Sequence, residues 1–181
     1  MSERIFTRIH GGRIIYLDDI RPGDIRIEDI AFYLARIPRF NGGGTRRYSV
    51  AEHSIWCSRV VGERHRFQAL MHDAPEYLTG DVTTPVKQML GDKMVELEQR
   101  IWAAICEKFE LSPFLSEEVK WADKAAYYRE RDSLGFNPRY NQPDWDDPQE
   151  KEYQAREPLL DLTPAEAKEL FLIEFNKWRH V

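Results

Sequence analysis

Four ionisable side chains crowd an otherwise apolar stretch of the chain, ALMHDAPEYLTGDVTTPVK, which spans residues 69–87. His72, Asp73, Glu76 and Asp81 fall within ten consecutive positions of it. On a helix, His72 and Asp73 diverge by about 100° and bracket one point, and Glu76 lies one turn after His72. Burying these groups is costly unless they pair with one another or coordinate a cation. The stretch therefore favours a metal site over a solvated face.

Two residues elsewhere in the chain have the type and surroundings of further metal ligands. His53 lies in a predicted helix among apolar residues, and Asp123 lies among tryptophan and alanine residues. Taken alone, a histidine in the place of His53 is more often a core residue with hydrogen-bonded ring nitrogens. Taken alone, Asp123 would be a helix cap or the partner of a neighbouring lysine. Together with His72 and Asp73 they supply two imidazoles and two carboxylates. This mixed set suits one divalent transition ion, such as Mn, Fe, Co, Ni or Zn, with positions left for water.

The elements that must position these residues are predicted to be helices. Apolar residues recur with helical spacing, which predicts an all-α fold, a compact bundle of about six helices. The predicted helices span 27–37, 50–62, 64–72, 92–109, 116–134 and 163–178. The segment 5–16 is predicted to form a short hairpin or extended arm, and 137–158 a long loop. We expect one domain over 1–181, with its core at 27–134 and a C-terminal helix within 159–181.

Helix boundaries are marked by capping residues and by proline. Ser49 and Glu52 have the spacing of a capping box, and Thr163 and Glu166 repeat it before the last predicted helix. Pro75 lacks an amide hydrogen, so it is predicted to kink the preceding helix or to start a new one. Irregular backbone beside clustered polar residues is a further indication of a site.

Composition limits the class of protein. The 181 residues carry a formal net charge of −5, which argues against stable nucleic-acid binding but allows a small anionic substrate held by local cations. No apolar run approaches transmembrane length and the first letters, MSER, do not resemble a signal peptide, so we expect no membrane association. Cys57 and Cys106 lack a CxxC spacing and are predicted to be buried free thiols. We expect a cytoplasmic protein, or one of the host cytoplasm if a phage encodes it.

Three segments, YSVAEHS, LMHDAPEYLTGDVTTPVK and VKWADKAAYY, carry an H…HD…D pattern in a wider context. In these segments the chain resembles the HD-domain metal-dependent phosphohydrolases, and it is similar to the bacterial 5′-deoxynucleotidases and the compact phage dATP triphosphohydrolases. The resemblance covers roughly residues 27–134. It implies that one metal ion is held by His53, His72, Asp73 and Asp123. It also implies that Glu76 activates or positions the attacking water and that Asp81 lies near the sugar and the water.

Further residues are predicted to bind substrate. By the same resemblance, Arg39 lies where the family places an arginine on the substrate phosphate. Phe40 stands where the deoxynucleotidases have a tryptophan against the sugar and base, and it keeps an aromatic face there. Pro85 and Lys87 in TTPVK, and Lys120 in VKWADK, complete the predicted set. The two lysines would act as point charges on phosphate, although helix-end lysines are often simply solvated.

The residues leave several functions open. The first is cleavage of the 5′ phosphoester of a deoxynucleoside monophosphate, and the second is a dNTP triphosphohydrolase reaction, with magnesium as a further ion for a polyphosphate. Arg46 and Arg47, beside a Gly-rich loop, would favour a polyphosphate if they faced the site. A third alternative, a non-catalytic metal-stabilised binding module, is disfavoured because Glu76 and Asp81 are both present. The absence of a GYP motif disfavours a cyclic-dinucleotide phosphodiesterase. The resemblance implies a homo-oligomer, a dimer or hexamer, with a small nucleotide as its ligand.

Overall fold

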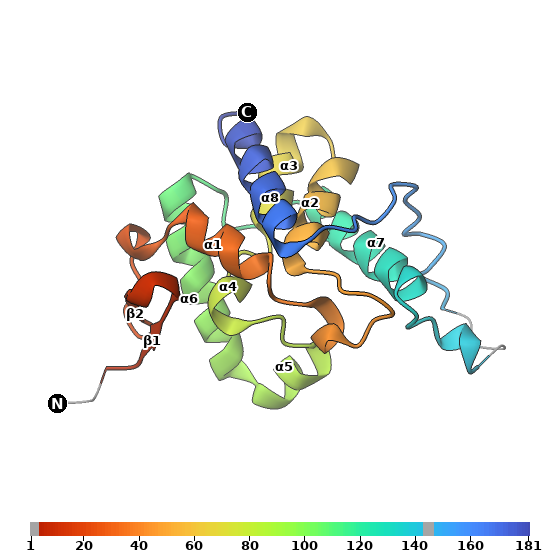
Figure 1. Cartoon of the computed structure of the whole chain (residues 1–181), viewed down its shortest axis with the longest axis horizontal. Coiled ribbons are helices and arrows are strands. Elements are labelled where there is room, and N and C mark those ends of the chain that lie inside the picture. Colours follow the sequence, from red (N-terminus) through yellow and green to blue (C-terminus); the bar gives the residue numbers. More distant parts are fainter. Residues whose placement is uncertain (1–3, 143–146) are drawn as a thin grey trace.

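Helix α2, Val50–Val60, lies at the centre of an all-α bundle in the computed structural model, which describes residues 4–142 and 147–181 (Figure 1). The other helices are α1 (Ile27–Leu34), α3 (Glu63–Met71), α4 (Glu76–Thr79), α5 (Thr84–Leu90), α6 (Asp92–Phe109), α7 (Glu117–Ser133) and α8 (Pro164–Trp178). Because α2 packs against α3, α7 and α8, its residues from Val50 to Ser58 are all buried. A central helix therefore carries His53.

The predicted all-α class is confirmed. Each of the six predicted segments contains a helix, and these are the six helices of at least eight residues within the described part of the chain. The short helix α5 was not predicted, whereas α4 is the new helix that Pro75 was predicted to start. The segment 5–16 is a hairpin in which β1 (Phe6–Arg8) pairs antiparallel with β2 (Ile14–Tyr16).

The predicted interruption at Pro75 is confirmed. Helix α3 ends at Met71, residues 72–75 form a turn, and α4 begins at Glu76 directly after the proline. The turn places two of the clustered residues, His72 and Asp73, between helices rather than inside one. The segment can therefore direct these side chains independently of the helical period.

Both predicted capping boxes are present. The Ser49 hydroxyl accepts a hydrogen bond from the Glu52 amide at the start of α2, and Thr163 and Glu166 make the same arrangement at α8. Glu52 has a second role, because its carboxylate also accepts the amide of Leu162 at 3.0 Å. The start of the central helix is thereby tied to the segment that precedes α8.

The predicted loop 137–158 lies partly outside the described residues, at 143–146. In its described part, Asp147 accepts a hydrogen bond from the Tyr128 hydroxyl at 2.8 Å, and the carbonyl of Glu157 accepts one from the Trp56 indole at 3.0 Å. These contacts hold the loop against α7 and α2. In the part of the chain that the structure describes, we find no helix with both the length and the apolar character needed to cross a membrane.

Candidate active site

One ligand atom from each of four side chains lies within 4.8 Å of the other three, and the residues are His53, His72, Asp73 and Asp123. The His53 Nε2 atom lies 3.3 Å from His72 Nε2, 3.2 Å from Asp73 Oδ2 and 3.3 Å from Asp123 Oδ1. The His72 Nε2 atom lies 3.4 Å from Asp73 Oδ2 and 3.8 Å from Asp123 Oδ1. The structure thus brings together residues from α2, from the turn after α3 and from α7.

These separations test whether the cluster could hold a metal ion. Transition ions bind such ligands at about 2.0–2.2 Å, which puts neighbouring ligand atoms about 3.0 Å apart at right angles and about 3.4 Å apart at the tetrahedral angle. The pairwise distances around His53 fall in that interval, and the 3.8 Å between His72 Nε2 and Asp123 Oδ1 corresponds to a wider angle between two ligands. Two carboxylates also match the charge of a divalent cation, and two imidazoles supply the nitrogen donors that transition ions favour. The donor set and its spacing therefore fit such an ion.

The two aspartates of the cluster are in the ionised form that metal binding requires. Burial opposes the charged form of both, but the neighbouring imidazoles outweigh it and hold the pKa of Asp73 and Asp123 well below the usual range. Both carboxylates are therefore available as ligands at neutral pH without first losing a proton.

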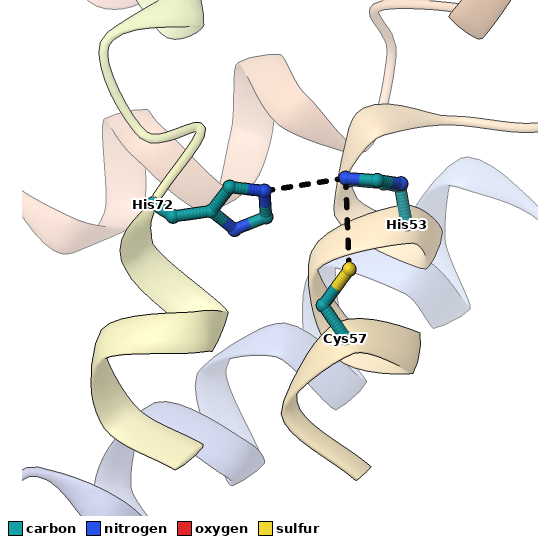
Figure 2. Close-up of side chains that lie close together, drawn as sticks. All are labelled: His53, Cys57 and His72. Carbon is teal, nitrogen blue, oxygen red and sulfur yellow. Dashed lines mark hydrogen bonds between the residues drawn. The ribbon is translucent and has the colours of Figure 1, made fainter. Parts of the chain in front are cut away.

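Cys57 faces the same point as the two histidines (Figure 2). Its Sγ atom lies 3.7 Å from His53 Nε2, one helical turn along α2. The sequence predicted a buried free thiol here, and that is confirmed. Burial raises the pKa of the Cys57 thiol to about 11, so the group is a neutral thiol beside the imidazoles at neutral pH.

Each histidine of the cluster is oriented through its other ring nitrogen. His72 donates from Nδ1 to the carbonyl of Ala69 at 2.7 Å, and His53 donates from Nδ1 to Glu130 Oε1 at 2.6 Å. Both bonds leave Nε2 directed at the cluster, as is usual for metal-ligating histidines. Glu130 was not predicted. It lies on α7 seven residues after Asp123, two turns further along one face, and this spacing was the signal in the sequence.

Glu76 lies buried beside the cluster, at the first position of α4. Its Oε2 atom has no hydrogen-bond partner among the described residues, and its Oε1 atom lies 3.8 Å from Lys87 Nζ. Burial, together with the negative charges of Asp73 and Asp81, raises the pKa of Glu76 to about 10. A buried carboxyl oxygen without a protein partner is the kind of group that takes a water or substrate partner.

A cavity of about 920 Å³ opens beside the cluster, and it is large enough for a nucleotide. It joins six of the residues predicted for catalysis and substrate binding: Arg39, Phe40, Glu76, Asp81, Pro85 and Lys87. Lys124 and Tyr127 of α7 also line it and were not predicted. The Phe40 ring stacks on Phe136 with centroids 4.6 Å apart, and it lies 6.4 Å from Tyr127. Phe40 and Tyr127 thus give the cavity an aromatic wall, with Phe136 behind Phe40.

Arg39 extends into this cavity from a loop before α2, and its side chain is 13% exposed. It pairs with Glu130 at 3.1 Å, and its Nη1 atom lies 3.5 Å from Asp81 Oδ2 and 4.0 Å from Asp73 Oδ2. A guanidinium held among carboxylates keeps its charge, and it offers a planar donor edge to phosphate.

The two predicted phosphate-binding lysines have different surroundings. Lys87 lines the cavity, and its ammonium lies 2.8 Å from Glu98 Oε1. Lys120 pairs instead with Glu117 at 2.7 Å and lines a separate groove beside Trp121. The structure therefore brings Lys87, and not Lys120, to the cavity beside the cluster.

Arg46 and Arg47 bind the C-terminal segment instead of facing the cavity. Arg46 donates to the carbonyl of Leu160 at 2.7 Å, and Arg47 donates to the carbonyl of Leu162 at 3.3 Å. Both side chains are partly exposed, at 30% and 35%, but neither lines the cavity, so they do not support a polyphosphate substrate.

Comparison with known proteins gives three informative relatives, and no family model matches the sequence. The chain is 45% identical over 133 residues to an uncharacterized protein of Rhodobacter capsulatus, covering 68% of each chain. It is 41% identical over 132 residues to the uncharacterized protein YfdR of Escherichia coli, covering 73% of this chain and 74% of YfdR. It is 31% identical over 131 residues to a dATP triphosphohydrolase of Salmonella phage PMBT28, covering 54% of this chain and 67% of the phage protein.

Proposed function

The chain belongs to one family with the Rhodobacter capsulatus protein and YfdR, and we propose that it is a metal-dependent phosphohydrolase of the HD-domain type that acts on nucleotides. The similarity to a phage dATP triphosphohydrolase supports nucleotide hydrolysis as the reaction class. The observation that carries the proposal is the convergence of His53, His72, Asp73 and Asp123 beside the buried Glu76 at the edge of a large cavity.

The proposed metal ligands are the four residues of that cluster. When bound, a divalent ion supplies positive charge that acidifies water, polarises a phosphoryl oxygen and lowers the pKa of the adjacent Glu76. The protein holds the two imidazoles by their Nδ1 hydrogen bonds, so their Nε2 atoms stay free to bind.

The reaction that we propose is hydrolysis of the 5′ phosphoester. Water adds to the α-phosphorus, the bond from phosphorus to the 5′ oxygen breaks, and that oxygen takes up a proton as the nucleoside leaves. Glu76 accepts the proton of the attacking water in its ionised form, which the charges of Arg39 and Lys87 favour. Arg39 and Lys87 bind phosphate oxygens, and Asp81 faces the sugar.

The aromatic wall of the cavity is the proposed site for sugar and base. Phe40 is fixed by its stacking on Phe136, and Tyr127 lies beside it with the ring planes tilted by 34°. A flat apolar surface of this kind binds a base or sugar face without requiring a hydrogen-bond pattern. Pro85 lines the same cavity next to Lys87.

We propose a deoxynucleoside monophosphate as the first substrate class and a deoxynucleoside triphosphate as the second. The second is favoured by the activity named for the phage relative, and by Lys124, which adds a third cation to the cavity wall. Both substrates undergo the same bond cleavage, and they differ in whether phosphate or triphosphate leaves.

The test is hydrolysis of a panel of ribo- and deoxyribonucleoside mono- and triphosphates with Mn, Co or Zn, with the products identified by mass. We expect nucleoside plus phosphate or triphosphate from at least one substrate, and loss of this activity in Glu76→Gln. Glu174→Gln is the matched control, since Glu174 is a largely buried glutamate of α8 that binds the Trp178 indole at 2.7 Å, outside the cavity lining. A wild-type protein that hydrolyses no nucleotide with any of these ions overturns the proposal.

A further inference from the structure

Glu130 lies on α7 with no exposed side-chain surface, and both of its carboxylate oxygens contact residues of the proposed site. We propose that it is a positioning residue that holds a metal ligand, His53, and a phosphate-binding residue, Arg39, in their working geometry. This inference rests on the proposed function, which gives those two residues their roles. Through its one carboxylate, Glu130 connects the metal-binding part of the site with the phosphate-binding part.

The first half of the argument concerns His53. The Oε1 atom of Glu130 accepts the His53 Nδ1 hydrogen at 2.6 Å, the shortest of the ring contacts in the cluster. This bond selects the tautomer with a free Nε2 and fixes the plane of the ring, which is a common arrangement behind metal-bound histidines. The partners lie 77 residues apart in sequence, so the contact depends on the packing of α2 against α7.

The second half concerns Arg39. The Oε2 atom of Glu130 lies 3.2 Å from Arg39 Nε and 3.1 Å from Nη2, so it occupies one edge of the guanidinium. The Nη1 atom is left with the longer contacts, at 3.5 Å to Asp81 and 4.0 Å to Asp73. Glu130 therefore leaves the Nη1 end of the guanidinium, which has only the longer contacts, directed toward the cavity, where it could bind a phosphate.

A purely structural role makes a different prediction. A second buried arginine–glutamate pair involves the same helix, in which Arg131 Nη2 lies 3.2 Å from Glu150 Oε2, with the side chains 3% and 14% exposed. Glu150 lines neither the cavity nor the cluster. If Glu130 only stabilised the fold, Glu130→Gln and Glu150→Gln would both lower the melting temperature and leave ligand affinities unchanged.

The experiment compares the wild type, Glu130→Gln and Glu150→Gln, each stripped of metal and titrated with cobalt or zinc. We expect Glu130→Gln to weaken metal binding about tenfold to a hundredfold, because it removes the charge behind His53. We also expect it to weaken binding of inorganic phosphate and to raise the KM for nucleotide, because Arg39 loses the negative charge that holds its Nε and Nη2 groups. Glu150→Gln should match the wild type in all three measurements.

Each outcome bears on the inference. Unchanged metal affinity in Glu130→Gln overturns it, and so does an equal loss in both variants, which would mean general destabilisation. A wild-type protein that shows Glu130-dependent metal binding but no nucleotide hydrolysis overturns the proposed reaction and leaves the positioning of His53 standing. A wild-type protein that binds none of the ions overturns both.

A measurement on the wild type covers the case in which Glu130→Gln does not fold. In the zinc-loaded protein, nitrogen-15 NMR of labelled histidine should show a slowly exchanging Nδ1 hydrogen on the ring that lies next to Cys57, which is His53. Rapid exchange of that hydrogen with water, or a proton on Nε2 instead, overturns the inference.

Discussion

Two glutamates with no exposed side-chain surface, Glu52 and Glu130, stabilise their buried charge in different ways. Glu52 is bonded mainly to backbone amides, accepting those of Ser49 at 2.8 Å and Leu162 at 3.0 Å. Glu130 is bonded to two side chains, those of His53 and Arg39. The first region, around Glu52, ties the start of α2 to the segment before α8. The second region, around Glu130, joins α2, α7 and the loop that carries Arg39.

The difference shows why burial and pairing alone do not identify a functional charge. A buried carboxylate that accepts backbone amides orders the chain, and its removal leaves those amides without partners. A buried carboxylate that holds a histidine and an arginine facing a cavity orients groups that can bind ligands. We therefore expect substitutions near Glu52 to change stability, and substitutions near Glu130 to change metal and substrate binding.

The largest expected effect is that of Asp73→Ala in the second region. The substitution removes a metal ligand, so we expect loss of bound metal and a fall in activity to the rate without enzyme. The melting temperature of the metal-free protein should stay near that of the wild type. The second carboxylate, that of Asp123, remains beside the two imidazoles when Asp73 is lost. Metal content by mass spectrometry is the readout, and His72→Ala should behave alike. Full metal stoichiometry in either variant would remove these residues from the ligand set.

Glu76→Gln should have the next largest effect, a fall in kcat of about a hundredfold to ten-thousandfold with metal content unchanged. The amide keeps the shape of the side chain but accepts no proton from water. Steady-state kinetics beside metal analysis measures both properties. Turnover at the wild-type rate would reassign the base.

In the first region, Glu52→Ala should lower the free energy of unfolding by about 3 kcal/mol, since two amides lose a charged acceptor. For a chain of this size that corresponds to a fall of roughly 6–12 °C in melting temperature, with kcat per folded molecule unchanged. Glu166→Ala is the matched control, because it removes the same capping-box position from an exposed site on α8. An equal loss of stability in both variants would show that the buried tether to Leu162 contributes nothing.

Metal removal should change the stability of variants in the two regions differently. An ion that binds only the folded protein, at a hundred times its Kd, adds about 2.7 kcal/mol of stability, and a chelator removes that increment. The increment should be preserved in Glu52→Ala and absent in Asp73→Ala, as measured by thermal unfolding with and without cobalt. An increment in Asp73→Ala as large as in the wild type would place the ion elsewhere.

Much of the fold could be predicted because its signals are local. Ser49 and Glu52 cap a helix from three residues apart, and Pro75 ends one by its own lack of an amide hydrogen. The short helix α5, Thr84–Leu90, was missed although Thr83 precedes it and it has a proline in its first turn. Its apolar residues Val86, Met89 and Leu90 are exposed, so it has no buried stripe to reveal it.

One part of the candidate site could be predicted because chemistry and proximity in sequence coincide, whereas His53 and Asp123 were predicted from their residue types, their apolar surroundings and the family resemblance. His72, Asp73 and Glu76 stand together in the chain, and the structure keeps them together. Glu130 could not be paired with its partners in this way, because they lie 77 and 91 residues away and meet it only through tertiary packing. Proximity in sequence also suggested that Lys120, near Asp123, binds substrate, whereas its ammonium lies beside Glu117.

The smallest expected effect is that of Lys120→Ala, which should change neither kcat/KM nor the free energy of unfolding by more than about 0.5 kcal/mol. Its side chain is 57% exposed and its carboxylate partner 86% exposed, and such pairs contribute little. Lys87→Ala is the matched comparison, since Lys87 is 29% exposed and lines the cavity near Glu76. Loss of a charged phosphate contact there should lower kcat/KM about tenfold or more. Equal losses in the two variants would return Lys120 to the substrate site, and would mean that the cavity beside α7 extends to the groove at Trp121 when nucleotide binds.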